Sequence, residues 1–145
     1  MVKARRSSWL ILIALVLLAI VSASHWLEPK ERVPWRNDFA AAQAEAARTH
    51  KPVLAYFTAN WCGYCQEMKH TTWADQGVAN ALANYVPVKI DVDAHGDLAK
   101  KYNVSGLPSY AVLDESGKVL QAGDGMLTPA EFTAWLHGTQ FNFLH

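Results

Sequence analysis

The feature that most constrains this chain is a pair of cysteines, Cys62 and Cys65, placed where an apolar run ends. They are the only two cysteines in 145 residues, whereas a framework of structural disulfides needs several pairs that close long loops. Such a Cys-x-x-Cys pair forms either half of a zinc site or a dithiol that is reversibly oxidised. No second Cys-x-x-Cys or His-x-x-x-His could complete a zinc site, and Gln66 replaces the histidine that covalent haem attachment requires. We therefore expect a redox-active dithiol, with no metal and no cofactor besides its own disulfide.

The residues around the pair predict a strand that leads into a helix. Residues 53–58 are a short apolar, β-prone run that follows Pro52, and the residues after Cys62 favour a helix. The amino-terminal end of a helix offers unpaired N–H groups and a partial positive charge, which favour a thiolate at Cys62. Cys65 lies one turn further into the helix. We expect it to be the more buried sulfur and to resolve a mixed disulfide.

Two segments of the chain resemble the thioredoxin superfamily. One is Trp-Cys-Gly-Tyr-Cys at 61–65, and the other is Val-Ser-Gly-Leu-Pro-Ser-Tyr at 104–110, which is similar to the loop whose cis-proline faces the dithiol. The resemblance covers about residues 36–138. It looks most like the C-terminal periplasmic domain of the thiol:disulfide interchange protein DsbD and its stand-alone relatives. It implies an α/β thioredoxin fold, in which a central mixed β-sheet of about four strands is flanked by helices.

The resemblance also implies a site and a reaction. Cys62 attacks a protein or peptide disulfide, and Cys65 then releases the reduced substrate. The implied substrate-binding residues lie beside this pair: Trp61, Gly63, Tyr64, Leu107 and Pro108. Pro108 is expected in cis, so that the Leu107 backbone can pair with an extended substrate as an added strand. An envelope reductase of this kind requires a membrane electron donor of the DsbD type. The alternatives are an oxidase or isomerase, which the isomerase-like pair at 63–64 keeps open, and a non-catalytic binding or chaperone module.

One position departs from the family pattern. Tyr56 stands where thioredoxins and the DsbD domain commonly carry a buried aspartate, and a tyrosine with a reference pKa of about 10 cannot be a carboxylate base near pH 7. Lys89 matches the lysine that accompanies that aspartate, so it is expected to hydrogen-bond Tyr56 or to favour a thiolate. We expect the proton of Cys65 to leave through water or Glu67. A plain core aromatic is the other interpretation of Tyr56.

Composition and patterning divide the chain into three parts. Residues 1–27 have a basic start and then an uncharged apolar run, which predicts a signal peptide or a signal anchor. Either would place the domain in the periplasm, and an uncleaved segment would hold it at the inner membrane. Residues 28–36, with Pro29 and Pro34, are expected to form a linker before a domain at 37–145. The net charge is zero, and the part after the basic start is mildly acidic, which argues against nucleic-acid binding.

Periodicity places the elements within that domain. Helices are expected at 38–47, after Cys62, at 75–82 and at 95–102, and strands at 53–58, at 85–92, at 109–113 and from a turn at 115–118 through 121. Thr128-Pro129-Ala130-Glu131 is a capping box that begins a closing helix. Trp73 is interpreted as a lid on the core rather than as a binding aromatic. This order predicts a mixed sheet covered on both faces.

Overall fold

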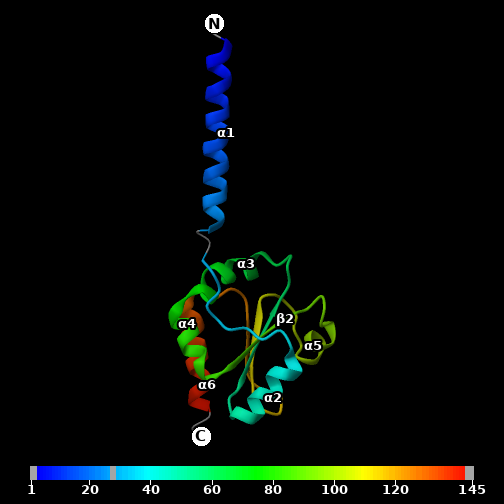
Figure 1. The fold of residues 1–145 in the computed structure, drawn as a ribbon. Coiled ribbons are helices and arrows are strands. Elements are labelled where there is room, and N and C mark those ends of the chain that lie inside the picture. The colour runs from blue at the N-terminus through cyan, green and yellow to red at the C-terminus, as the bar shows by residue number, and fades with distance from the viewer. Residues whose placement is uncertain (1–2, 27–28, 143–145) are drawn as a thin grey trace.

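The computed structural model describes the backbone of residues 3–26 and 29–142, and the side chains of 8–24 and 29–138. Both ends of the segment expected at 1–27, the first residue of the expected linker and the last residues of the domain expected at 37–145 therefore lie outside the described residues. The basic side chains of Lys3, Arg5 and Arg6 do so as well. The structure begins with α1 (Lys3–Trp26), a single long helix (Figure 1). Its apolar side chains from Trp9 to Val21 are exposed. In the described part of the chain, no helix combines the length and hydropathy that crossing a membrane requires.

Four strands form one mixed sheet, as predicted: β1 (Val53–Thr58), β2 (Val86–Asp91), β3 (Ser109–Leu113) and β4 (Val119–Asp124). Their order across the sheet is β2-β1-β3-β4. β1 pairs with β2 in parallel and with β3 antiparallel, and β3 pairs antiparallel with β4. The strand that leads to Cys62 is therefore central, which fixes the dithiol at the end of a strand that is paired on both sides.

The helices lie on both faces of this sheet (Figure 1). They are α2 (Phe39–Thr49), α3 (Gly63–His70), α4 (Gln76–Ala81), α5 (Gly96–Lys101) and α6 (Pro129–Asn142), with 3-10 turns η1 (Thr72–Ala74) and η2 (Leu82–Asn84). Alternation along β1 separates two cores. Val53, Ala55 and Phe57 pack towards α2 and α5. Leu54 and Tyr56 pack in the other cluster, with side chains of α3, α4 and α6.

Most predicted boundaries agree with the structure, and one strand is longer than predicted. The strands at 53–58 and 109–113 have the expected bounds, and the capping box begins α6 as expected. β4 continues three residues beyond 121, because Asp124 pairs with Ser109 at the far end of β3. A neighbouring strand decides that extension, and local propensity does not reveal it. Trp73 is fully buried, so its interpretation as a core residue is confirmed.

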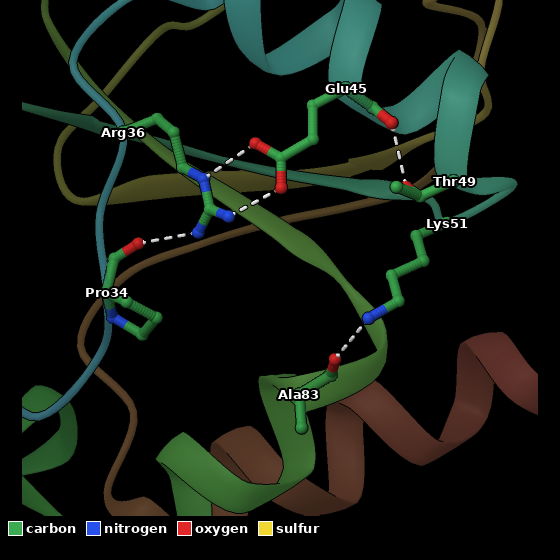
Figure 2. A network of polar contacts seen from close by, with 6 residues as sticks. All are labelled: Pro34, Arg36, Glu45, Thr49, Lys51 and Ala83. Carbon is green, nitrogen blue, oxygen red and sulfur yellow. Dashed lines mark hydrogen bonds and ion pairs between the residues drawn. The ribbon is translucent and has the colours of Figure 1, made fainter.

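Residues 31–36, predicted to belong to a linker, lie on the domain, and we call them the strap. The Arg32 N–H donates to the Trp73 carbonyl, Val33 is buried, and Trp35 packs on the core. The Arg36 guanidinium donates to both carboxylate oxygens of Glu45 in α2, at 3.0 and 2.6 Å, and to the Pro34 carbonyl (Figure 2). The strap is thus fixed at both ends, and its first residue reaches the region of the dithiol.

Candidate active site

Cys62 and Cys65 form a disulfide at the amino-terminal end of α3. Cys62 is the N-cap residue, and its sulfur accepts a hydrogen bond from the Cys65 backbone N–H at 3.2 Å. An N–H group and the positive end of a helix, both directed at a sulfur, stabilise that sulfur as a thiolate. The strand-to-helix arrangement expected from the sequence therefore places Cys62 where a leaving or attacking sulfur is favoured.

The sequence predicted that Cys65 is more buried than Cys62, but the two cysteines are buried to nearly the same extent. Cys62 is 4 % exposed and Cys65 is 3 % exposed as whole residues, so the sequence-based contrast between an accessible and a buried cysteine is absent in this oxidised state. The reason is a small apolar cluster, in which Ala59, Val92 and Leu107 pack against the disulfide. Little of either cysteine is therefore open to solvent, and the exposed residues lie beside Cys62.

The proline loop lies beside the disulfide, and the Leu107–Pro108 peptide bond is cis. Leu107 packs against the cluster that contains both sulfurs. Two hydrogen bonds hold the loop: Gly125 N–H donates to the Pro108 carbonyl at 2.9 Å, and the Ser109 hydroxyl donates to the Gly106 carbonyl at 2.7 Å. The dithiol and the proline loop, more than forty residues apart in the sequence, thus meet where β1 ends and β3 begins.

Two exposed aromatic side chains border the disulfide. Trp61 is 70 % exposed and Tyr64 is 64 % exposed, whereas most other aromatic side chains of the domain are covered. The Trp61 Nε1–H donates to Asp93 at 3.0 Å, which fixes the orientation of the indole. Large apolar groups held in solvent next to a reactive bond are suited to contact another protein.

Residues 39–140 match the family model described as a thioredoxin-like domain. The chain belongs to the thioredoxin-like family. A thiol:disulfide interchange protein DsbD of Yersinia pestis (strain Pestoides F) is 36 % identical over 95 residues, which cover 61 % of this chain and 16 % of that protein. The chain therefore spans about a sixth of the length of this curated relative.

Solved structures agree with this assignment. The oxidised DsbD c-terminal domain of Neisseria meningitidis is 28 % identical, with a TM-score of 0.60 over 72 % of this chain and 98 % of that one. A thioredoxin from Thermus thermophilus is also 28 % identical, with a TM-score of 0.67 over 74 % of this chain and 87 % of that one. The expected thioredoxin fold is confirmed.

Tyr56 is a core residue of this thioredoxin-like domain. It is 1 % exposed and packs against both Trp35 and Trp73, with ring centroids 5.4 and 4.9 Å away. Its hydroxyl lies near Trp73 and Thr58, but it forms no hydrogen bond of ordinary geometry with any described residue. Burial raises the pKa of Tyr56, and the nearby Glu31 carboxylate adds to this increase. Tyr56 therefore keeps its proton near neutral pH and does not replace a carboxylate base.

Lys89 has a partner that sequence reasoning did not identify. Its Nζ donates to both carboxylate oxygens of Glu31 at 2.7 Å each, and it lies 5.5 Å from the Trp35 ring centroid. The expectation that Lys89 hydrogen-bonds Tyr56 is not met, because the strap brings an acidic side chain to it. Val33 and Trp35, two apolar residues in alternate positions of a charged stretch, were the signal that this segment packs on the domain.

A cavity of about 130 Å³ joins this ion pair to the dithiol. Its lining comes from the strap, β1, α3 and β2: Glu31, Tyr56, Thr58, Asn60, Cys65, Gln66, Lys69 and Lys89. Glu67, the proposed proton acceptor, is exposed and does not line this cavity. Successive helical residues turn by about 100°, so Gln66 and Lys69 share the Cys65 side of α3 more closely than Glu67 does. No group of His, Cys, Asp and Glu side chains suited to a metal occurs among the described residues.

Proposed function

We propose that this chain is a thiol:disulfide oxidoreductase that reduces disulfides of other proteins in the cell envelope. The observation that carries the proposal is the Cys62–Cys65 disulfide at the start of α3, packed against the cis-proline loop. A disulfide between cysteines three positions apart closes a very short loop, so it adds little to stability. Its function is therefore reversible oxidation and reduction.

The proposed reaction proceeds in two exchanges. In the reduced protein, the Cys62 thiolate attacks one sulfur of a substrate disulfide, and the other substrate sulfur leaves as a thiolate. Cys65 then loses its proton and attacks the Cys62 sulfur, which breaks the mixed disulfide and releases the second substrate thiolate. The substrate gains two electrons, and the chain ends with its internal disulfide. A dithiol donor of the DsbD type would return the chain to the reduced state by the same steps in reverse.

The exposed aromatic pair and the proline loop support the assignment of substrate-binding roles. Trp61 and Tyr64 would contact the substrate on one side of Cys62. The space beside Gly63 is open, because a Cβ there would meet nothing within 4 Å, so a substrate could approach this residue. The backbone of Leu107, next to Pro108, would pair with an extended substrate segment on the other side.

The proposal also places the domain in the periplasm, after export across the inner membrane. The basic start and the exposed apolar helix α1 support a signal peptide or a signal anchor, and relatives named as DsbD support a periplasmic location. A periplasmic dithiol meets oxidants, so a reductase there depends on a dedicated electron donor.

The first test is catalysis of insulin reduction by dithiothreitol, with the full chain and two variants. We expect acceleration by the native protein and its loss in Cys62→Ser. Cys65→Ala should accumulate mixed disulfides on Cys62, because the resolving sulfur is missing. Titration with glutathione should give a reduction potential nearer to the about −270 mV of thioredoxin than to the about −120 mV of DsbA. A potential at the oxidising end would indicate an oxidase instead, and the absence of redox cycling would indicate a binding module.

A further inference from the structure

The resolving step needs a proton acceptor beside Cys65, and the surroundings of that residue restrict the choice. Four other titratable side chains line the cavity that Cys65 faces: Glu31, Tyr56, Lys69 and Lys89. Two of them are lysines, which are cationic near neutral pH. The third, Tyr56, is buried in the aromatic core. Glu31 is thus the one carboxylate among the described residues that line this cavity.

Contacts of its own carboxylate and of the next residue hold Glu31 at this position. The next residue, Arg32, donates its backbone N–H to the Trp73 carbonyl at 2.7 Å and its Nε–H to the Ala74 carbonyl at 3.0 Å. Each oxygen of the Glu31 carboxylate accepts a hydrogen bond from Lys89 Nζ at 2.7 Å, and only 19 % of the Glu31 side chain is exposed. A partly buried carboxylate that accepts a hydrogen bond on each oxygen has little freedom to rotate into solvent.

The cavity also has room for solvent. Its volume of about 130 Å³ exceeds the roughly 15 Å³ that a cavity needs to hold one water molecule. Polar groups surround it, and the buried Tyr56 hydroxyl has no hydrogen-bond partner among the described residues. Water in such a place can link the Cys65 thiol with the Glu31 carboxylate, because each end offers a hydrogen-bonding group.

We propose that Glu31, supplied by the strap, accepts the proton of Cys65 through cavity water during the resolving step. This inference rests on the proposed function. The Cys65 S–H bond breaks, its proton passes to water while a water proton passes to the Glu31 carboxylate, and the Cys65 thiolate forms the bond to Cys62 as the substrate thiolate leaves. Lys89 positions the carboxylate, and its positive charge at the same cavity favours the Cys65 thiolate. In the reverse direction, protonated Glu31 returns the proton to Cys65 as it leaves Cys62.

The test separates the two chemical steps within one experiment. The reduced full-length protein, in excess, is mixed rapidly with dithiobis-nitrobenzoate, and release of thionitrobenzoate is followed over a range of pH. Attack by Cys62 releases the first equivalent, and attack by Cys65 on the mixed disulfide releases the second. Cys65→Ala identifies the phases, because it lacks the intramolecular attack: it should release the first equivalent normally, and the second only slowly, by a second protein molecule, at a rate that rises with protein concentration.

We expect Glu31→Gln to leave the first phase unchanged and to slow the second phase by about tenfold or more at neutral pH. The second phase should also become proportional to hydroxide concentration, because solvent base then has to take the proton. Glu67→Gln is the matched control, a glutamate outside the cavity, and should behave as the native protein in both phases. Glu31→Asp, which keeps the charge, should restore part of the rate and the native pH profile.

Two results would overturn the inference. One is an unchanged second phase in Glu31→Gln, and the other is an equal slowing in Glu67→Gln. Lys89→Gln removes the group that positions the carboxylate but keeps the carboxylate, so it should slow the second phase less than Glu31→Gln does. Absence of the first phase in the native protein would instead contradict the proposed function.

Discussion

At the scale of single residues, Tyr110 shows how burial changes the chemistry of a side chain. It is 2 % exposed, its ring packs on Phe132 and Trp135, and its hydroxyl donates to the Asp124 carbonyl at 3.3 Å. Burial, followed by the charges of Asp124 and Glu131, raises the pKa of Tyr110 to about 12. The folded state therefore holds this proton at a pH where an unfolded chain has lost it.

We predict that this difference makes the protein less stable in alkali. An unfolded tyrosine ionises near pH 10, so the stabilisation is complete below that pH and is lost as pH rises towards about 12. The free energy of unfolding should fall by up to about 2 kcal/mol over this window, an upper limit because Asp124 beside the hydroxyl is exposed. Urea unfolding at several alkaline pH values measures it. The decrease should be smaller in Tyr110→Phe, whereas Tyr64→Phe, at an exposed position, should follow the native protein. Equal slopes in the native protein and Tyr110→Phe would contradict the assignment.

At the scale of elements, α6 depends on the hydrogen bonds at its first turn. Glu131 accepts from the Thr128 N–H at 2.9 Å and from the Thr128 hydroxyl at 2.7 Å. Bonds from Thr128 lower the pKa of Glu131. Phe132 and Leu136, which follow in α6, are fully buried in the core, so the cap fixes the point from which these side chains enter it.

Thr128→Ala should lower the free energy of unfolding by about 1 kcal/mol near neutral pH. The difference from the native protein should shrink as acid protonates Glu131. Because the pKa of this carboxyl is lower in the folded than in the unfolded state, its stabilisation is complete at a pH above the unfolded-state pKa. That stabilisation is lost as the pH falls through the folded-state pKa. Thermal unfolding followed by circular dichroism measures both effects. Thr49→Ala, at the end of α2 where the hydroxyl bonds within its own helix, is the control and should change stability by less than about 0.5 kcal/mol. A loss in Thr128→Ala no larger than that in Thr49→Ala would argue against the cap.

At the scale of the whole molecule, the folded unit is larger than the matched family domain. The family model begins at residue 39, yet the strap at 31–36 buries Val33, packs Trp35 on the core and ties Arg36 to Glu45. The Arg36 backbone also pairs with β2 at Val88, so the strap joins β2, the aromatic core and α2. The strap therefore acts as part of the domain in stability as well as in the site.

A comparison of two shortened chains tests this. A chain that begins at residue 29 should unfold like the native domain, whereas one that begins at residue 37 should lose at least about 3 kcal/mol, since it gives up a buried valine, a packed tryptophan and charged hydrogen bonds. Urea unfolding of the oxidised proteins measures the difference. Equal midpoints for the two chains would show that the strap contributes nothing to stability.

Patterns of neighbouring residues were sufficient to predict several parts of this protein. The dithiol, the strand before it, the helix after it and the capping box at Thr128 each follow from patterns a few residues long, and the structure has them. The resemblance at the dithiol and at the proline loop indicated the fold. These predictions succeeded because local propensity and tertiary structure agree in these segments.

The surroundings of Cys65, in contrast, depend on how distant segments of the chain pack. Glu31 and Lys89 are 58 positions apart, and no periodicity relates a charged residue of the strap to the middle of β2. The similar burial of the two cysteines arises from the packing of Leu107, Val92 and Ala59. Likewise, the length of β4 depends on pairing with β3. Contacts between distant segments form because the domain packs against both faces of one sheet, and a local pattern carries no record of them.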